Sequence, residues 1–102
     1  MSNLTTILAA TMEQANSEEF ILDAPNTILL INSAGYQGTE KSVLQIFDNS
    51  IQNWKSYNND QYTLDTTTNA ITFTNGQLGR YRFAKTITTE PVAITKEFRV
   101  NI

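Results

Sequence analysis

Two short runs late in the chain constrain its fold more than any other part of the sequence. Within residues 69–85, apolar residues alternate with threonines in the first run and with arginines in the second: Ile71 and Phe73, then Tyr81 and Phe83. A β-strand points successive side chains to opposite faces, so each run has one apolar and one polar face. Asn75-Gly76 between the runs is a strong turn signal, because both residues tolerate positive φ. The segment predicts a β-hairpin whose four apolar side chains share one core.

The rest of the chain also has the pattern of short strands separated by turns. We expect them over residues 19–23, 27–32, 42–47, 52–57, 61–64 and 92–100. Residues 27–32 are apolar on both faces, which predicts a central strand or one covered by another chain. Residues 5–13 fit a helical stripe or a strand, and the β character downstream favours the strand. Roughly seven to nine short strands predict an all-β fold, an antiparallel β-sandwich of Ig-like or related type, or a small barrel.

Length and composition fit one small domain that spans residues 1–102, in which residues 1–13 form a docking arm or an edge strand. Charged residues make up 17% of the chain, below the roughly 25% of typical domains, and 26 of the 102 residues are Thr or Asn. A neutral polar surface suits strands and turns, and it is also common in proteins that pack against neighbours.

Several classes of protein are disfavoured. The net charge is −3 and the pI about 4.7, with no basic stripe, so no nucleic-acid binding is expected. No apolar run approaches the roughly 20 residues that span a bilayer, so no membrane association is expected. The opening segment lacks the basic start and apolar stretch of a signal peptide, which predicts synthesis in the cytosol. With no cysteine there is no disulfide framework.

The sequence also contains few residues that could carry out catalysis. The chain has neither histidine nor cysteine, so the usual general base, the commonest metal ligand and the thiol nucleophile are absent. Ser50 and Ser56 have no evident base partner, and the ten carboxylates are scattered. Asp48-Asn49-Ser50 offers oxygens but lacks the spacing of a calcium loop, which favours a turn chosen for backbone reasons. We expect no catalytic residue, no metal and no cofactor.

The second of the two alternating runs resembles the tyrosine corner of immunoglobulin-type sandwiches. In that corner a Gly two residues before a Tyr lets the chain turn, and the Tyr hydroxyl bonds back to the backbone. Gly79 and Tyr81 stand in those places, and Phe83 stands where antibody domains keep their second cysteine. The three are expected to be structural residues; the alternative is an ordinary inward aromatic on a strand.

Read as a whole, the chain resembles small accessory proteins in the virions of tailed bacteriophages. The resemblance rests on a Thr/Ala-rich opening, an early strand, a Pro-marked break, an apolar strand, a strand pair ending in aromatics and a Gly-x-Tyr-Arg strand followed by Lys. These are residues 5–10, 20–22, 24–25, 27–31, 43–47, Trp54, 79–83 and Lys85. The resemblance implies a non-enzymatic virion protein, a capsid decoration (cement) or head or tail accessory protein that packs against other virion proteins.

Aromatic residues are the first candidates for binding. Three of them lie close together in the sequence around a polar turn: Trp54, Tyr57 and Tyr62. They are expected to belong to the core, to form an interface with another protein, or to form a platform on which sugar rings stack. The last possibility is the alternative function, a carbohydrate-binding module on a tail or fibre. Tyr36, between Gly35 and Gly38, is expected at a loop tip, where an amphipathic side chain can anchor a contact.

Apolar residues near the start are the second set of interface candidates. They are Leu4, Ile7, Leu8 and Met12. Together with the two-sided strand 27–31 they carry more apolar surface than a chain this short easily covers alone, and few charges guard the edges. We therefore expect a homo-oligomer, or docking on a lattice, with the N-terminal segment in the contact. The alternative is that this segment completes the chain's own sheet.

Overall fold

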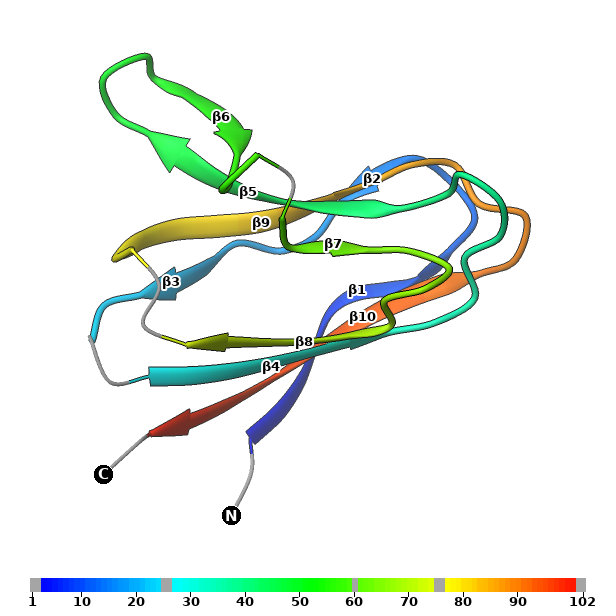
Figure 1. The fold of residues 1–102 in the computed structure, drawn as a ribbon, viewed down its shortest axis with the longest axis horizontal. Coiled ribbons are helices and arrows are strands. Elements are labelled where there is room, and N and C mark those ends of the chain that lie inside the picture. Colours follow the sequence, from blue (N-terminus) through cyan, green and yellow to red (C-terminus); the bar gives the residue numbers. More distant parts are fainter. Residues whose placement is uncertain (1–2, 25–26, 60, 75–76, 101–102) are drawn as a thin grey trace.

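A computed structural model describes residues 3–24, 27–59, 61–74 and 77–100. These residues form ten strands and no helix, arranged as two facing antiparallel sheets (Figure 1). The strands are β1 (Asn3–Thr11), β2 (Ala15–Asn16), β3 (Phe20–Leu22), β4 (Thr27–Ser33), β5 (Ser42–Asp48), β6 (Asn53–Ser56), β7 (Thr63–Leu64), β8 (Ala70–Thr74), β9 (Gly79–Lys85) and β10 (Val92–Val100). The predicted all-β sandwich is confirmed; the unexpected tenth strand is the short β2, where the sequence indicates a turn.

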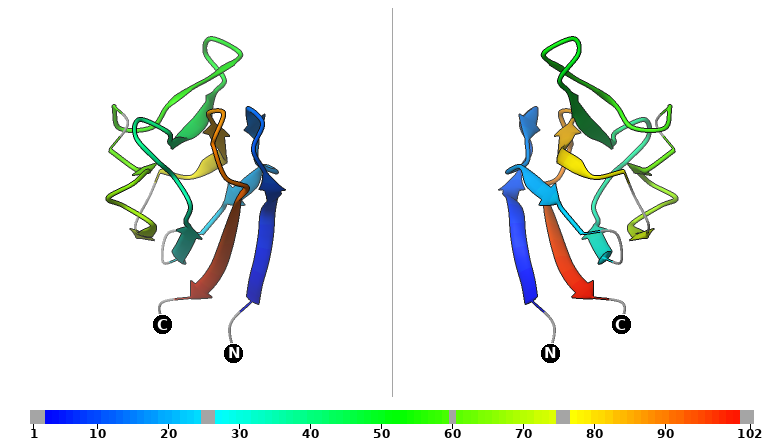
Figure 2. Two further views of the ribbon diagram at one scale, coloured as in Figure 1. Left: turned by 90° about the vertical axis from the view of Figure 1, so that its right-hand side faces the viewer. Right: turned by 90° about the vertical axis from the view of Figure 1, so that its left-hand side faces the viewer.

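The first sheet, sheet A, has the strand order β1-β10-β4-β8. Strand β4, which is apolar on both faces, lies between β10 and β8, so it has a neighbour on each side as predicted. Leu29 and Ile31 point into the core, whereas Ile28 and Leu30 lie half-buried on the outer face. Figure 2 shows β1 and β10 running side by side at one edge of this sheet.

The second sheet, sheet B, has β9 and β5 at its centre. On one side β9 pairs with the short strands β2 and β3, and on the other β5 pairs with β6 and β7. The β5–β6 hairpin projects from one end of the sandwich (Figures 1 and 2). Strands β5 and β6 follow each other in sequence and pair directly, joined by residues 49–52, with Gln52 at a φ of 53° just before β6.

The core lies between the two sheets and is filled from both. Its apolar members are Ile7, Phe20, Leu22, Leu29, Ile31, Tyr36, Leu44, Ile46, Leu64, Ile71, Phe73, Tyr81, Phe83, Val92 and Ile94. The predicted inward set of Ile71, Phe73, Tyr81 and Phe83 is confirmed, since none of these side chains is more than 8% exposed. Burying each such side chain contributes on the order of 1.5–3 kcal/mol to the free energy of unfolding.

The predicted hairpin over residues 69–85 is wrong. Strand β8 pairs with β4 in sheet A, and β9 pairs with β5 in sheet B, so the chain crosses between the sheets instead of folding back beside itself. The Asn75-Gly76 turn itself lies outside the described residues. Apolar residues alternate in the same way in a hairpin and in two strands that face each other across a core. The alternation therefore cannot distinguish the two arrangements.

At this crossing the geometry of a tyrosine corner is present. The Tyr81 hydroxyl donates a hydrogen bond to the carbonyl oxygen of Gln77, four residues upstream. Gly79 has a φ of +155°, which a residue with a Cβ rarely adopts. Phe83 is fully buried and its ring stacks beside Phe20. A structural role for these three residues remains a prediction, which substitutions test.

The closing strand distinguishes this sandwich from an immunoglobulin domain. In the immunoglobulin order the last strand lies in the same sheet as the strand that carries the tyrosine corner. Here β10 lies in sheet A between β1 and β4, opposite β9. The fold is thus a related antiparallel sandwich in which the segment 3–11, expected as an arm or an edge strand, is paired along β10 as an edge strand.

Candidate functional site

The outer face of sheet B gathers arginine and aromatic side chains, and its composition follows from strand register. In β9 the inward residues are Tyr81 and Phe83, so Arg80 and Arg82 must point outward. Cross-strand pairing sets Ile21 beside Arg80 and Gln45 beside Arg82. One step further across the sheet, Phe47 pairs with Trp54. We call the surface formed by Glu19, Ile21, Gln45, Phe47, Trp54, Arg80 and Arg82 the Arg–aromatic face.

Arg80 binds an acidic and an aromatic partner at the same time. Its Nε and Nη2 both donate to Glu19 Oε1, at 3.0 and 2.8 Å. Its Cζ lies 4.6 Å from the centroid of the Phe47 ring and 5.6 Å from that of Trp54. The Phe47 and Trp54 rings meet edge to face, with centroids 5.4 Å apart. Because both members of the ion pair are about half exposed, the pair orients the side chains more than it stabilises the fold.

Arg82 covers the Trp54 ring. Its Cζ lies 4.4 Å from the centroid of that ring, and its Nε donates to Gln45 Oε1 at 2.8 Å. A guanidinium over an indole face is attracted by the ring quadrupole, by about 0.5–1 kcal/mol at exposed sites and more when partly dry. Arg82, Gln45 and Trp54 are each half-buried, so the three hold one another in fixed orientations.

The predicted aromatic group divides between this face and the core. Trp54 lies on the Arg–aromatic face, whereas Tyr57 and Tyr62 stack on each other and on Phe73 of the core. The Tyr57 hydroxyl accepts a hydrogen bond from the Gln77 amide at 3.2 Å. The three rings expected together around the polar turn therefore do not form one platform.

Tyr36 is not at a loop tip as predicted, and this part of the prediction is wrong. Its side chain is 7% exposed. Its hydroxyl accepts a hydrogen bond from Ser33 Oγ at 3.0 Å and shares one with Ser42 Oγ at 2.7 Å. Burial raises the pKa of the Tyr36 phenol. Two serines on different sheets supply the polar partners that allow the hydroxyl to be buried.

The N-terminal candidates are separated by the alternation of β1. Ile7 is buried in the core and Leu8 is half-buried against it, so in this structure Ile7 is not available to a partner. Leu4 and Met12 are 65% and 51% exposed. Leu4 pairs with Glu97 on the outer face of sheet A, far in the fold from the Arg–aromatic face on sheet B.

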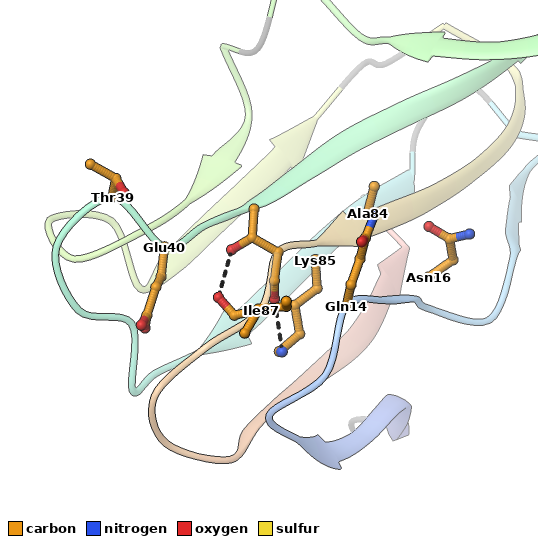
Figure 3. A pocket seen from close by; sticks show the side chains of 8 residues that line it. Gln14, Asn16, Thr39, Glu40, Ala84, Lys85 and Ile87 are labelled. Carbon is orange, nitrogen blue, oxygen red and sulfur yellow. Dashed lines mark hydrogen bonds between the residues drawn. The ribbon is translucent and has the colours of Figure 1, made fainter.

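A shallow pocket at one end of the sandwich contains a lysine and a glutamate. It is lined by Gln14, Asn16, Thr39, Glu40, Ala84, Lys85, Thr86 and Ile87 (Figure 3). Both charged groups have structural partners. Lys85 is 2% exposed; its amine donates to the carbonyl oxygens of Glu13 and Thr86 at 2.7 and 2.9 Å, and burial lowers its pKa.

Glu40 in the same pocket is fixed by three donors. Its carboxylate accepts from the Gln37 amide at 2.8 Å and from the amide and hydroxyl of Thr89 at 2.9 and 2.7 Å. The Thr89 hydroxyl is the main reason that the pKa of Glu40 lies below its usual value. The described residues contain no group of three acidic, histidine or cysteine side chains that could hold a metal. They also contain no helix of the length and hydrophobicity needed to cross a membrane.

Sequence reasoning located Trp54 but missed its neighbours on the Arg–aromatic face. A signal was present, because the alternation that sends Tyr81 inward necessarily sends Arg80 and Arg82 outward. The partners Gln45 and Phe47 come from a strand that no local pattern places beside β9.

The fold is a small antiparallel sandwich, and the outer face of sheet B carries the Arg–aromatic face. No protein-family model matches the chain, and no curated protein matches it in sequence. Among solved structures, it is similar to the crystal structure of the SPBc2 prophage-derived protein YomS, with a TM-score of 0.66 and 14% sequence identity. The match covers 96% of this chain and 92% of that chain. At this identity the likeness shows a shared fold.

Proposed function

We propose that the chain is a non-enzymatic structural protein of a phage virion, a capsid decoration (cement) or head or tail accessory protein that acts by packing against other virion proteins. The observation that carries the proposal is the Arg–aromatic face, since Arg, Trp and Phe are the residues that protein interfaces favour. The fold shared with a prophage-derived protein supports the phage setting. The chain is then made in the cytoplasm of the bacterial host and ends in the virion.

Packing against protein is favoured over sugar binding by the surroundings of Trp54. A sugar platform needs an open aromatic face, but Arg82 lies over this ring and the Phe47 ring meets it at an angle of 74°. A glycan array probed with the isolated chain tests the carbohydrate-binding module directly. Under the proposal no glycan on the array is retained.

Purified particles of the encoding phage provide the main test. We expect mass spectrometry to find the chain in gradient-banded particles at a fixed ratio to the major capsid protein. Particles that lack the chain should regain it when the purified protein is added, and a cement role predicts that they then survive higher temperatures. The double variant Arg80→Gln with Arg82→Gln should bind less, whereas Lys41→Gln with Lys55→Gln, which removes the same charge, should bind as the wild type does. Absence of the chain from banded particles would contradict the proposal.

Self-association is the second part of the proposal, with the edge of sheet A as the contact. The outer edge strand β1 carries no charged residue between Leu4 and Met12, and free monomers commonly guard such an edge with Lys or Pro. Leu4→Lys, at an exposed position, should shift the mass measured by light scattering toward the monomer. Deletion of residues 2–12 should instead prevent folding, because it removes Ile7 from the core. A wild-type chain that is monomeric at all concentrations would contradict this part.

A further inference from the structure

We propose that Arg82 is the anchor of a binding site for a carboxylate of a protein partner. The inference deepens the proposed function, because it names the chemistry that the partner must present. It rests on one feature of the Arg–aromatic face: the two arginines are not equivalent.

Arg80 is neutralised and Arg82 is not. Among the described residues the ion pairs are Arg80 with Glu19 and Lys55 with Asp48. The carboxylate of Glu19, the residue before Phe20, binds Arg80. Arg82 therefore keeps a full positive charge without an acidic partner in the described part of the chain.

The Arg82 guanidinium is also held in a position suited to binding. Within the described residues its hydrogen bond is the one from Nε to the neutral amide of Gln45. Its Cζ lies over the Trp54 ring, and within the described residues the two terminal amino groups donate no hydrogen bond. Two parallel N–H donors match the two oxygens of a carboxylate, and a guanidinium fixed beforehand loses less side-chain entropy on binding.

The surroundings favour a protein over other anionic partners. The chain has a net charge of −3, so a polyanion such as nucleic acid is repelled at long range. Next to Arg82 on this face, around Arg80, lie Ile21, which is 59% exposed, and the half-buried ring of Phe47. A single charge with an apolar margin is the composition of a protein interface, in which an Asp or Glu of the partner meets Arg82 and its neighbours cover Ile21.

Trp54 provides a direct readout, since it is the single tryptophan of the chain and lies under Arg82. The full chain is titrated with acetylated tetraglutamate amide, and Trp54 emission is recorded. The glutamine and lysine tetrapeptides serve as neutral and cationic probes. We expect a saturable change with the glutamate peptide, weakened by salt, and none with the other two.

Variants separate the site from general charge. Arg82→Gln should lower the affinity for the glutamate peptide roughly tenfold or more, because a charge-assisted bidentate contact is lost. Arg82→Lys keeps the charge but not the fork, and should recover only part of the affinity. Lys55→Gln removes the same charge from the same sheet and should bind as the wild type does. Circular dichroism confirms that each variant is folded.

Several results would overturn the inference: no response of the wild type to the glutamate peptide, an equal response to the lysine peptide, or equal losses in Arg82→Gln and Lys55→Gln. The outcome is independent of the virion proposal. If the chain is absent from particles but the peptide titration is positive, only the proposed function is refuted. If the Arg82→Gln variant still binds particles, only the role of Arg82 as the anchor is refuted.

Discussion

The two faces of strand β9 have opposite relations to the rest of the molecule. On the inner face, Tyr81, Phe83 and Lys85 are at most 2% exposed; the two rings stack on Phe20, and the Lys85 amine binds the carbonyl oxygen of Glu13. On the outer face, Arg80 lies over the Phe47 ring and Arg82 over the Trp54 ring, and both arginines remain partly exposed to solvent. The alternation of β9 thus gives the strand two roles: the inward residues are part of the core, and the outward arginines form the surface that we propose for binding.

The largest effect should come from truncating the inner face. Phe83→Ala removes a fully buried ring, and we expect it to lower the free energy of unfolding by about 3–5 kcal/mol, measured by urea denaturation. Arg82→Gln, one residue away on the outer face, is the matched control and should cost less than about 1 kcal/mol. Similar losses for the two variants would remove the distinction between the faces.

The next effect concerns the start of the strand. Gly79→Val should cost about 1–3 kcal/mol, because a φ of +155° is strained for a residue with a Cβ. The added Cβ would meet Ile46 Cδ1 at 3.5 Å, an ordinary contact, so the cost is conformational and Gly79→Ala should show most of it. Ala84→Val on the outer face is the control and should stay within about 0.5 kcal/mol. An unchanged melting temperature for both Gly79 variants would refute the strain.

A smaller effect is expected from the corner hydrogen bond. Tyr81→Phe removes the hydroxyl that donates to the Gln77 carbonyl, and the free energy of unfolding should fall by about 0.5–1.5 kcal/mol. Tyr62→Phe is the control, because the described residues offer its hydroxyl no hydrogen bond while its ring stacks on Phe73. If Tyr62→Phe proves the more destabilising, the corner contributes nothing of its own.

The smallest effect should come from the outer ion pair. Glu19→Gln should change the free energy of unfolding by less than about 1 kcal/mol, and the difference should shrink further in high salt. The same variant leaves Arg80 unpaired, so it should strengthen binding of the glutamate peptide. A large stability loss would show that the outer face is part of the folding energetics after all.

The properties of the faces could be predicted from the sequence, whereas the pairing of strands could not. Alternation is local, and it correctly sent Phe73 and Tyr81 into one core. The turn signal after β8 is local as well, but the choice between folding back and crossing to the other sheet depends on where β4 and β5 lie. Tyr36 was misplaced for the same reason, since the fold brings Ser42 to its hydroxyl. At the candidate site, the outward direction of Arg82 was readable, but its position over Trp54 was not.

The place of β10 in sheet A also has a consequence for biosynthesis. Although β10 comes last among the described strands, it lies between β1 and β4, which have no common neighbour until residues 92–100 emerge from the ribosome. Contacts between segments far apart in sequence form slowly, because the entropy of closing the loop is lost first. During translation β1 therefore waits unpaired, as an uncharged and partly apolar segment of the kind that aggregates. A ribosome-bound chain truncated before Val92 should accordingly be sensitive to protease throughout, and the sandwich should assemble in one late step.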